Sequence, residues 1–263
     1  MSNLALSADT VALNWHDGDP GAAFALAAAS GKPVFLYWGA AWCPPCNRIK
    51  ASVFACDDFA AMSDTFVALH IDGDSAGAQQ LAERFRLRSY PTLIVYCPDG
   101  AEITRLPCEL DGARFMEILK VALGTSRTVA ESLSAALSRE RVVSNDEWRL
   151  LSCYSWDTDE RQVLKRLDFA ATLASMTRAC PLPEPLLRLQ WHTLYAAAMS
   201  GKGGIDQRAA VQRLEATLAD SGAVRAQMDV VINHARPGAL PDGAAVAGAY
   251  QPGAGLGHGA GPA

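Results

Sequence analysis

Residues 37–50 read YWGAAWCPPCNRIK, and this stretch places Cys43 and Cys46 two prolines apart. Two thiols at this spacing occur in structural disulfides, in zinc sites and in redox-active dithiols. These kinds of site differ in the secondary structure and in the additional ligands that they require. The sequence on either side of the pair therefore has to distinguish them.

A continuous apolar run, PVFLYWG, comes directly before this stretch and has the composition of a strand buried on both faces. Similar runs and a Pro-Asp-Gly turn predict five strands, at 10–15, 33–39, 65–72, 90–97 and 102–107. Helical patterns lie between or after them, at 19–30, 43–62, 75–87 and 111–123. Strands that alternate with helices predict an α/β fold with a central mixed sheet flanked by helices.

Strand signals end at Gly124, and helical signals replace them. Capping boxes, a Ser or Thr followed three residues later by Glu, open two helices at Thr128–Glu131 and Ser144–Glu147. The proline-rich segment at 181–185 separates two further helical stretches. After Arg236, 20 of 27 residues are Gly, Ala or Pro, a composition typical of disorder. We therefore expect an α/β domain, an all-α domain and a disordered tail, at 1–124, 125–236 and 237–263.

Composition and charge exclude several classes of protein. The net charge of −5 and the lack of a basic run argue against nucleic-acid binding. No run approaches the about 18 apolar residues of a membrane span. The first residues, MSNLALSADT, lack the basic and apolar regions of a signal peptide. We expect a cytoplasmic protein; a periplasmic location stays open if an upstream leader is missing from this sequence.

Neither zinc nor a structural disulfide suits the Cys43–Cys46 pair well. Zinc takes four ligands, often from a second Cys or His pair, and the sequence has no such pair among its five histidines and other cysteines. An inert disulfide fits a reducing compartment poorly. The remaining cysteines lie far apart and are interpreted as packing residues: Cys56, Cys97, Cys108, Cys153 and Cys180. No metal site is expected.

A redox role explains the position of the pair as well as its residue types. Cys43 follows a strand and begins a helix, where free N–H groups and the helix dipole favour a thiolate, the form that attacks disulfides. Cys46 lies one helical turn later and can displace a bound partner. Pro44 and Pro45 are tolerated in a first helical turn. They remove two N–H donors to the Cys43 sulfur, which predicts a weak oxidant suited to reductase or isomerase work.

Three motifs together resemble the thioredoxin superfamily. They are a WCPPC motif after a buried strand, a Tyr-Pro-Thr that opens a later strand, and a Gly-Lys-Pro that leads into the first central strand, at Trp42–Cys46, Tyr90–Thr92 and Gly31–Pro33. The third motif is similar to the thioredoxin-like domain of thiol:disulfide interchange proteins. The resemblance covers about residues 10–123 and implies a thioredoxin fold there, with a helical extension after it.

The resemblance also implies a role for each site residue. Cys43 corresponds to an exposed attacking thiol and Cys46 to a buried resolving thiol. Trp42 corresponds to a ring that shields the site and meets the partner. Pro91 corresponds to a proline preceded by a cis peptide bond, which leaves the backbone of Tyr90, just before Thr92, free to bind an extended substrate. No cofactor is implied beyond the Cys43–Cys46 disulfide.

Tyr37 departs from the pattern, because many thioredoxins have a buried acidic residue six positions before the first cysteine. That residue is thought to move the proton of the resolving thiol, and a phenol is a poor base at neutral pH. Either water or another group takes the proton, or resolution is slow.

These features predict a thiol:disulfide oxidoreductase whose partners are proteins or peptides with disulfides or thiols, together with an upstream reductant or oxidant. Two other functions stay open. One is a redox-sensing module whose helical part binds a partner, and the other is a chaperone-like adaptor whose helices hold unfolded clients.

Overall fold

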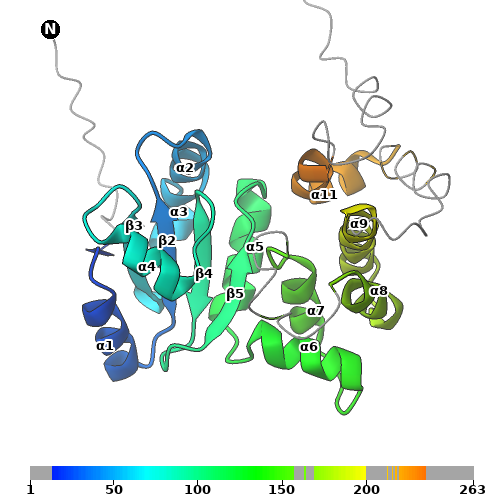
Figure 1. The fold of residues 1–263 in the computed structure, drawn as a ribbon, viewed down its shortest axis with the longest axis horizontal. Helices are drawn as coiled ribbons and strands as arrows, with labels where there is room; N and C mark the ends of the chain where they lie inside the picture. The colour runs from blue at the N-terminus through cyan, green and yellow to red at the C-terminus, as the bar shows by residue number, and fades with distance from the viewer. Residues whose placement is uncertain are drawn as a thin grey trace, which may run out of the picture.

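A computed structural model describes residues 14–156, 163, 169–199, 212, 215, 217 and 219–234, and the statements below concern these residues. Figure 1 shows a sheet with its helices in one half of the molecule and a group of further helices beside it. The predicted third segment, 237–263, lies entirely outside the described residues.

The sheet has five strands in the order β1-β3-β2-β4-β5. The strands are β1 (Trp15–Asp17), β2 (Val34–Gly39), β3 (Val67–Asp72), β4 (Thr92–Tyr96) and β5 (Glu102–Leu106). β3 runs parallel to both β1 and β2, whereas β4 is antiparallel to β2 and to β5. The prediction of a mixed sheet flanked by helices is confirmed.

The first strand lies later than the sequence suggested. The predicted range was 10–15, but β1 begins at Trp15, and residues 10–13 lie outside the described part. Trp15 pairs with Ala68 and packs against the rings of Phe35, Tyr37 and Phe54. These contacts come from distant parts of the chain, so the local apolar pattern could not set the bounds of the strand.

Side chains of successive strand residues point to opposite faces, and each face of the sheet has its own helices. Leu36 and Trp38 pack with α1 (Pro20–Ser30) and α4 (Ala78–Phe85). Phe35 and Tyr37 pack with the segment that carries the two cysteines and with α5 (Gly112–Leu123). Both faces of β2 are therefore buried, as the apolar run predicted.

The predicted helix over 43–62 is divided. The structure has α2 (Pro44–Ile49), a π-helical turn η1 (Lys50–Phe54) and α3 (Asp57–Ala61), followed by a 3-10 turn η2 (Ser63–Thr65). The backbone of Cys56 is extended and ends the first helical stretch. Phe54 at the end of η1 packs against the rings of Phe35 and Tyr37 on β2, and a pattern of apolar residues alone does not distinguish a π-helical turn from an α-helix.

The second group of helices comprises α6 (Val129–Ser138), α7 (Asn145–Ser152), α8 (Phe169–Ala179), α9 (Pro183–Met199) and α11 (Ser221–His234). Both predicted capping boxes are present, at Thr128 and at Ser144. In the described part of the chain, no helix is both long and apolar enough to cross a membrane.

One hydrophobic core runs from the sheet into these helices. It includes residues of α5, α7, α8 and α9, among them Phe115, Leu151, Leu173 and Leu189. α6 packs against β5, and the Ser155 N–H donates to the Arg105 carbonyl of β5 at 3.1 Å. The helices therefore cover the edge of the sheet, and a domain boundary at 124 stays a prediction.

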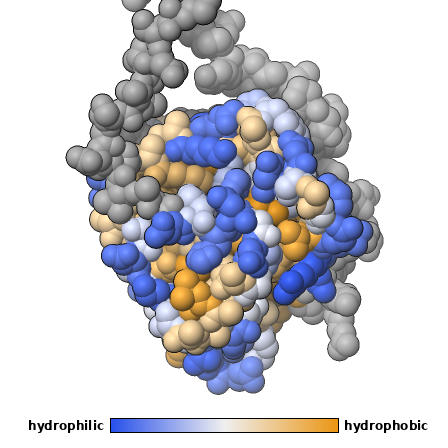
Figure 2. Space-filling model, turned by 90° about the vertical axis from the view of Figure 1, so that its left-hand side faces the viewer, coloured by the Kyte–Doolittle hydropathy of each residue, from blue (hydrophilic) through white to orange (hydrophobic). Residues whose placement is uncertain are grey.

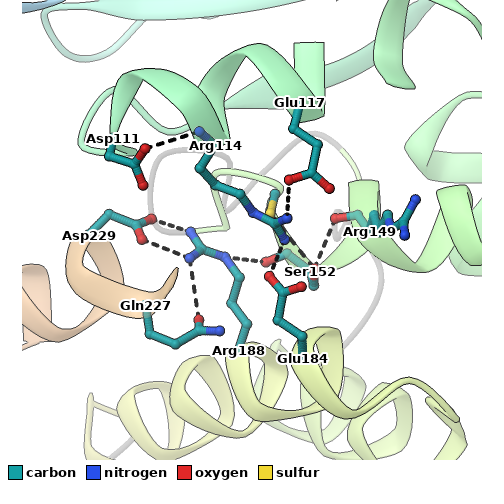
Figure 3. Close-up of polar contacts among 10 residues, drawn as sticks. Asp111, Arg114, Glu117, Arg149, Ser152, Glu184, Arg188, Gln227 and Asp229 are labelled. Carbon is teal, nitrogen blue, oxygen red and sulfur yellow. Dashed lines mark hydrogen bonds and ion pairs between the residues drawn. The ribbon is translucent and has the colours of Figure 1, made fainter. Parts of the chain in front are cut away.

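A buried ion pair joins two of these helices, as Figure 3 shows. Arg188 of α9 donates to both carboxylate oxygens of Asp229 in α11, and its Nε donates to the Ser152 carbonyl at 2.8 Å. Arg114 of α5 pairs with Glu184 at the start of α9. These contacts fix α9 and α11 against the part of the chain that contains the sheet.

Figure 2 views the molecule from the side of α1 and β1, where hydrophobic side chains lie scattered among hydrophilic ones.

Candidate redox site

The two cysteines lie at the start of α2, shortly after β2 ends. Cys43 is the N-cap residue, with an extended backbone (φ −77°, ψ 115°), and the two prolines occupy the first two helical positions. The Cys46 N–H is thus the first helical donor, and it donates to the Cys43 sulfur at 3.3 Å. The sequence predicted that Cys43 begins the helix and that Pro44 and Pro45 remove two donors, but not this hydrogen bond.

The expectation that Cys43 is exposed is wrong for this structure. Only 2% of its surface is accessible, and Cys46 is fully buried, as expected. The N-cap conformation turns the Cys43 sulfur back onto the helix end, so it faces Cys46 and the core instead of solvent. Both are free thiols here.

Burial, together with the contact with Cys43, raises the pKa of the Cys46 thiol to about 11. A thiol with this pKa is almost entirely protonated at neutral pH. Cys46 therefore has to lose a proton as it attacks.

Tyr90 lies near the dithiol, since both cysteines act on its phenol, and it comes shortly before β4, in which Thr92 lies opposite Trp38 of β2. The Tyr90–Pro91 peptide bond is cis. The Tyr90 ring stacks on Trp38 at 5.3 Å and meets the Trp42 ring edge-on at 5.5 Å. Burial raises the pKa of the Tyr90 phenol, and the nearby Asp74 and Asp72 carboxylates and the two cysteines add to the shift.

Gly73 makes room for the Tyr90 ring. A Cβ atom at this glycine would lie 2.1 Å from the Tyr90 hydroxyl, closer than two such atoms ever approach. The Thr92 hydroxyl donates to the Ser89 carbonyl at 2.7 Å and so fixes the turn on the other side of Pro91.

The sequence alone indicated no role at this site for Asp74. The Trp42 indole N–H donates to the Asp74 carboxylate at 2.7 Å, although 63% of the Trp42 surface is accessible. The Asp74 N–H in turn donates to the Asp72 side chain at 3.1 Å. β2 and β3 run parallel with Gly39 opposite Asp72, so the segments after them meet at one edge of the sheet. Two buried strands joined by a helical segment commonly run side by side and parallel, and this is the sequence signal that could have indicated the contact.

Tyr37 lies beneath the pair on β2 and is 1% exposed. Burial raises the pKa of its phenol, and the neighbouring Cys46 sulfur raises it further. The phenol is therefore neutral at all ordinary pH values, which agrees with the expectation that it is a poor base.

The other cysteines lie outside the site. Cys97, Cys153 and Cys180 are buried, and Cys56 and Cys108 are half-buried. Their burial agrees with the interpretation as packing residues. Within the described ranges, no three side chains of His, Cys, Asp or Glu gather as metal ligands do.

Residues 20–123 match a family model described as a thioredoxin-like domain. Thiol:disulfide interchange protein DsbD 2 of Pseudomonas aeruginosa is 33% identical over 96 residues, which make up 35% of this chain and 16% of that protein. DsbD 1 of the same organism is 34% identical over 105 residues, or 38% of this chain and 18% of that protein. The chain thus spans less than a fifth of the length of these two relatives.

Among solved structures, a thioredoxin from Thermus thermophilus is 28% identical, with 41% of this chain and 85% of that chain covered and a TM-score of 0.37. The match to the family model agrees with the sheet order and with the position of the cysteine pair at the start of α2. Residues 20–123 are therefore a thioredoxin-like domain, and in this chain helices follow it.

Proposed function

We propose that this chain is a thiol:disulfide oxidoreductase that acts on protein or peptide disulfides. The observation that carries the proposal is the pair of thiols at one helix start, with the Cys46 N–H directed at the Cys43 sulfur and Tyr90 beside both. An N–H donor and a helix N-terminus both stabilise a thiolate relative to a thiol. Cys43 is therefore the attacking sulfur of this proposal.

The exchange takes two steps. In the first, the Cys43 thiolate attacks one sulfur of the partner disulfide, a Cys43–partner bond forms, and the other partner sulfur leaves and takes a proton from water. In the second, Cys46 attacks the Cys43 sulfur, a Cys43–Cys46 disulfide forms, and the partner leaves as a thiol. Two electrons pass from the protein to the partner. A dithiol reductant returns the protein to its starting state.

The neighbours of the pair supply a surface for an extended partner. The peptide before Pro91 presents the Tyr90 backbone beside the dithiol, where a partner segment can add as a strand. Trp42 offers an exposed aromatic ring on the same side, held by Asp74. The burial of Cys43 requires the partner to displace covering atoms before attack.

Reduction of insulin by dithiothreitol tests the proposal. We expect the wild-type protein to accelerate the reaction and Cys43→Ser to return it to the uncatalysed rate. Cys56→Ser, which removes a half-buried thiol outside the site, is the matched control and should retain the wild-type rate. A wild-type rate no faster than dithiothreitol alone would refute the proposal.

A redox-sensing binding module is the second candidate, and the 2% exposure of Cys43 favours it. A sensor needs to be oxidised only once per signal, so a slow and covered thiol suffices. This function predicts no turnover of insulin but a change in partner binding when the Cys43–Cys46 disulfide forms.

A further inference from the structure

The position of the Tyr37 hydroxyl gives it a role in the proposed thiol:disulfide exchange. We propose that this hydroxyl donates a hydrogen bond to the Cys46 sulfur while Cys46 resolves the mixed disulfide. Tyr37 then acts as a fixed donor to a developing thiolate and not as a base. The inference rests on the proposed function and assigns a residue to its second step.

The Tyr37 ring is held by aromatic neighbours. It stacks on His70 at 5.1 Å and meets Phe54 edge-on at 5.0 Å, and Trp15 packs against it at 6.0 Å. His70 is itself fixed by Asp17, whose carboxylate lies 2.7 Å from its Nδ1. A ring packed this way has one orientation, so its hydroxyl has one position.

That position is against the dithiol. The hydroxyl is buried and within reach of the Cys46 sulfur, but among the described residues it completes no hydrogen bond of normal geometry. Gly39 leaves the space that the hydroxyl occupies, because a Cβ atom there would lie 2.2 Å from it. A buried hydroxyl without a partner is costly. A thiolate on Cys46 would supply the missing acceptor.

The charges around the hydroxyl favour a donor. Burial raises the pKa of Tyr37, so the phenol keeps its proton while Cys46 loses one. The other titratable groups that face the pair come from α2, η1 and β3: Cys43, Lys50, His70 and Asp72. The Lys50 ammonium lies 5.7 Å from the centre of the ring. Among these groups, the Tyr37 phenol is the one that offers a neutral O–H donor to the Cys46 sulfur.

The proton balance does not require Tyr37 to ionise. Cys46 gives up its proton, its sulfur bonds to the Cys43 sulfur, and the Cys43–partner bond breaks. The departing partner thiolate takes up the proton, directly or through water. Tyr37 begins and ends the step as a phenol, and its hydrogen bond is strongest when the negative charge is on Cys46.

Ellman's reagent separates the two steps, because Cys43 releases one thionitrobenzoate on attack and Cys46 releases a second on resolution. The background carries Cys56→Ser and Cys108→Ser, so that the half-buried thiols do not react. We expect Tyr37→Phe to slow the second release about tenfold, as the loss of a hydrogen bond to a charged group implies, and to move its pH profile to higher pH. The first release should stay within about twofold of the wild-type rate.

Tyr96→Phe is the matched control, since it removes a phenol from the cluster on the opposite face of the sheet. It should change neither release. A Tyr37→Phe protein with an unchanged second release, or with a slower one whose pH profile has not moved, overturns this inference but not the proposed function. A wild-type protein with no second release overturns the proposed function itself. Thermal unfolding verifies that each variant is folded.

Discussion

The ion pair in Figure 3 allows a quantitative prediction about how α11 is held. The side chains of Arg188 and Asp229 are each 3% exposed. The guanidinium donates to both Asp229 oxygens, to the Ser152 carbonyl at 2.8 Å and, more weakly, to Gln227 at 3.5 Å. Asp229→Ala would remove the only carboxylate among these partners and leave a buried cation.

The cost follows from desolvation. Removal of one partner of a buried ion pair typically costs about 3–5 kcal/mol, because the remaining charge keeps its desolvation penalty. A domain of ordinary stability has about 5–15 kcal/mol in total. At about 2–4 °C per kcal/mol, the melting temperature should fall by roughly 6–20 °C. Arg188→Met with Asp229→Leu removes both charges and should cost much less than Asp229→Ala alone.

Urea unfolding followed by far-UV circular dichroism measures these differences. The matched control is Asp146→Ala, which breaks the exposed Arg149–Asp146 pair at 3.0 Å and should cost no more than about 1 kcal/mol. If Asp229→Ala unfolds at the same urea concentration as Asp146→Ala, the reasoning about this contact is wrong.

Three further predictions concern the redox site. Burial raises the pKa of Cys46, to about 11 in the free dithiol, and part of that rise comes from the Cys43 thiol, which is absent in the mixed disulfide. The rate of resolution should therefore rise about tenfold per pH unit from neutral pH and level off between about pH 9 and pH 11, as stopped-flow release of a partner thiol would reveal; a plateau near pH 8 would contradict this. Gly73→Ala should push the Tyr90 ring out of place and destabilise the fold by about 1–3 kcal/mol, as thermal unfolding would measure. An unchanged melting temperature would show that Gly73 does not confine the ring. Asp74→Ala should release the Trp42 indole and raise KM for insulin about two- to tenfold with kcat retained. A loss confined to kcat would contradict a role of Trp42 in binding the partner.

Local patterns predicted the central part of the fold well. The apolar run before the cysteines is β2, and the Pro-Asp-Gly turn joins β4 to β5. α1 lies within the predicted range 19–30, and the Asp19 carboxylate caps it by accepting the Ala22 N–H at 2.9 Å. These features depend on neighbours in the sequence, which is why the sequence alone sufficed.

Features that depend on distant contacts were predicted less well. The bounds of β1 depend on its pairing with β3, and the residue that ends η1, Phe54, packs against rings on β2. The contact between Trp42 and Asp74 requires two parallel strands to end side by side.

At the site, residue types predicted the identity and spacing of the two thiols but not the exposure of Cys43. A helix start exposes its cap residue in general, yet this sulfur folds back onto the Cys46 N–H. The orientation of a side chain depends on the packing around it, and the local sequence pattern does not specify that packing.

The central claim is that Cys43 forms the bond with the partner and Cys46 breaks it. Mass spectrometry of the reduced protein after reaction with a disulfide-linked peptide tests it most directly. We expect Cys46→Ser to accumulate one peptide on Cys43, and the wild-type protein to release the peptide and carry a Cys43–Cys46 disulfide. Peptide attached to Cys56 or Cys108 instead, or a Cys43→Ser protein that still reduces the peptide, would contradict the account.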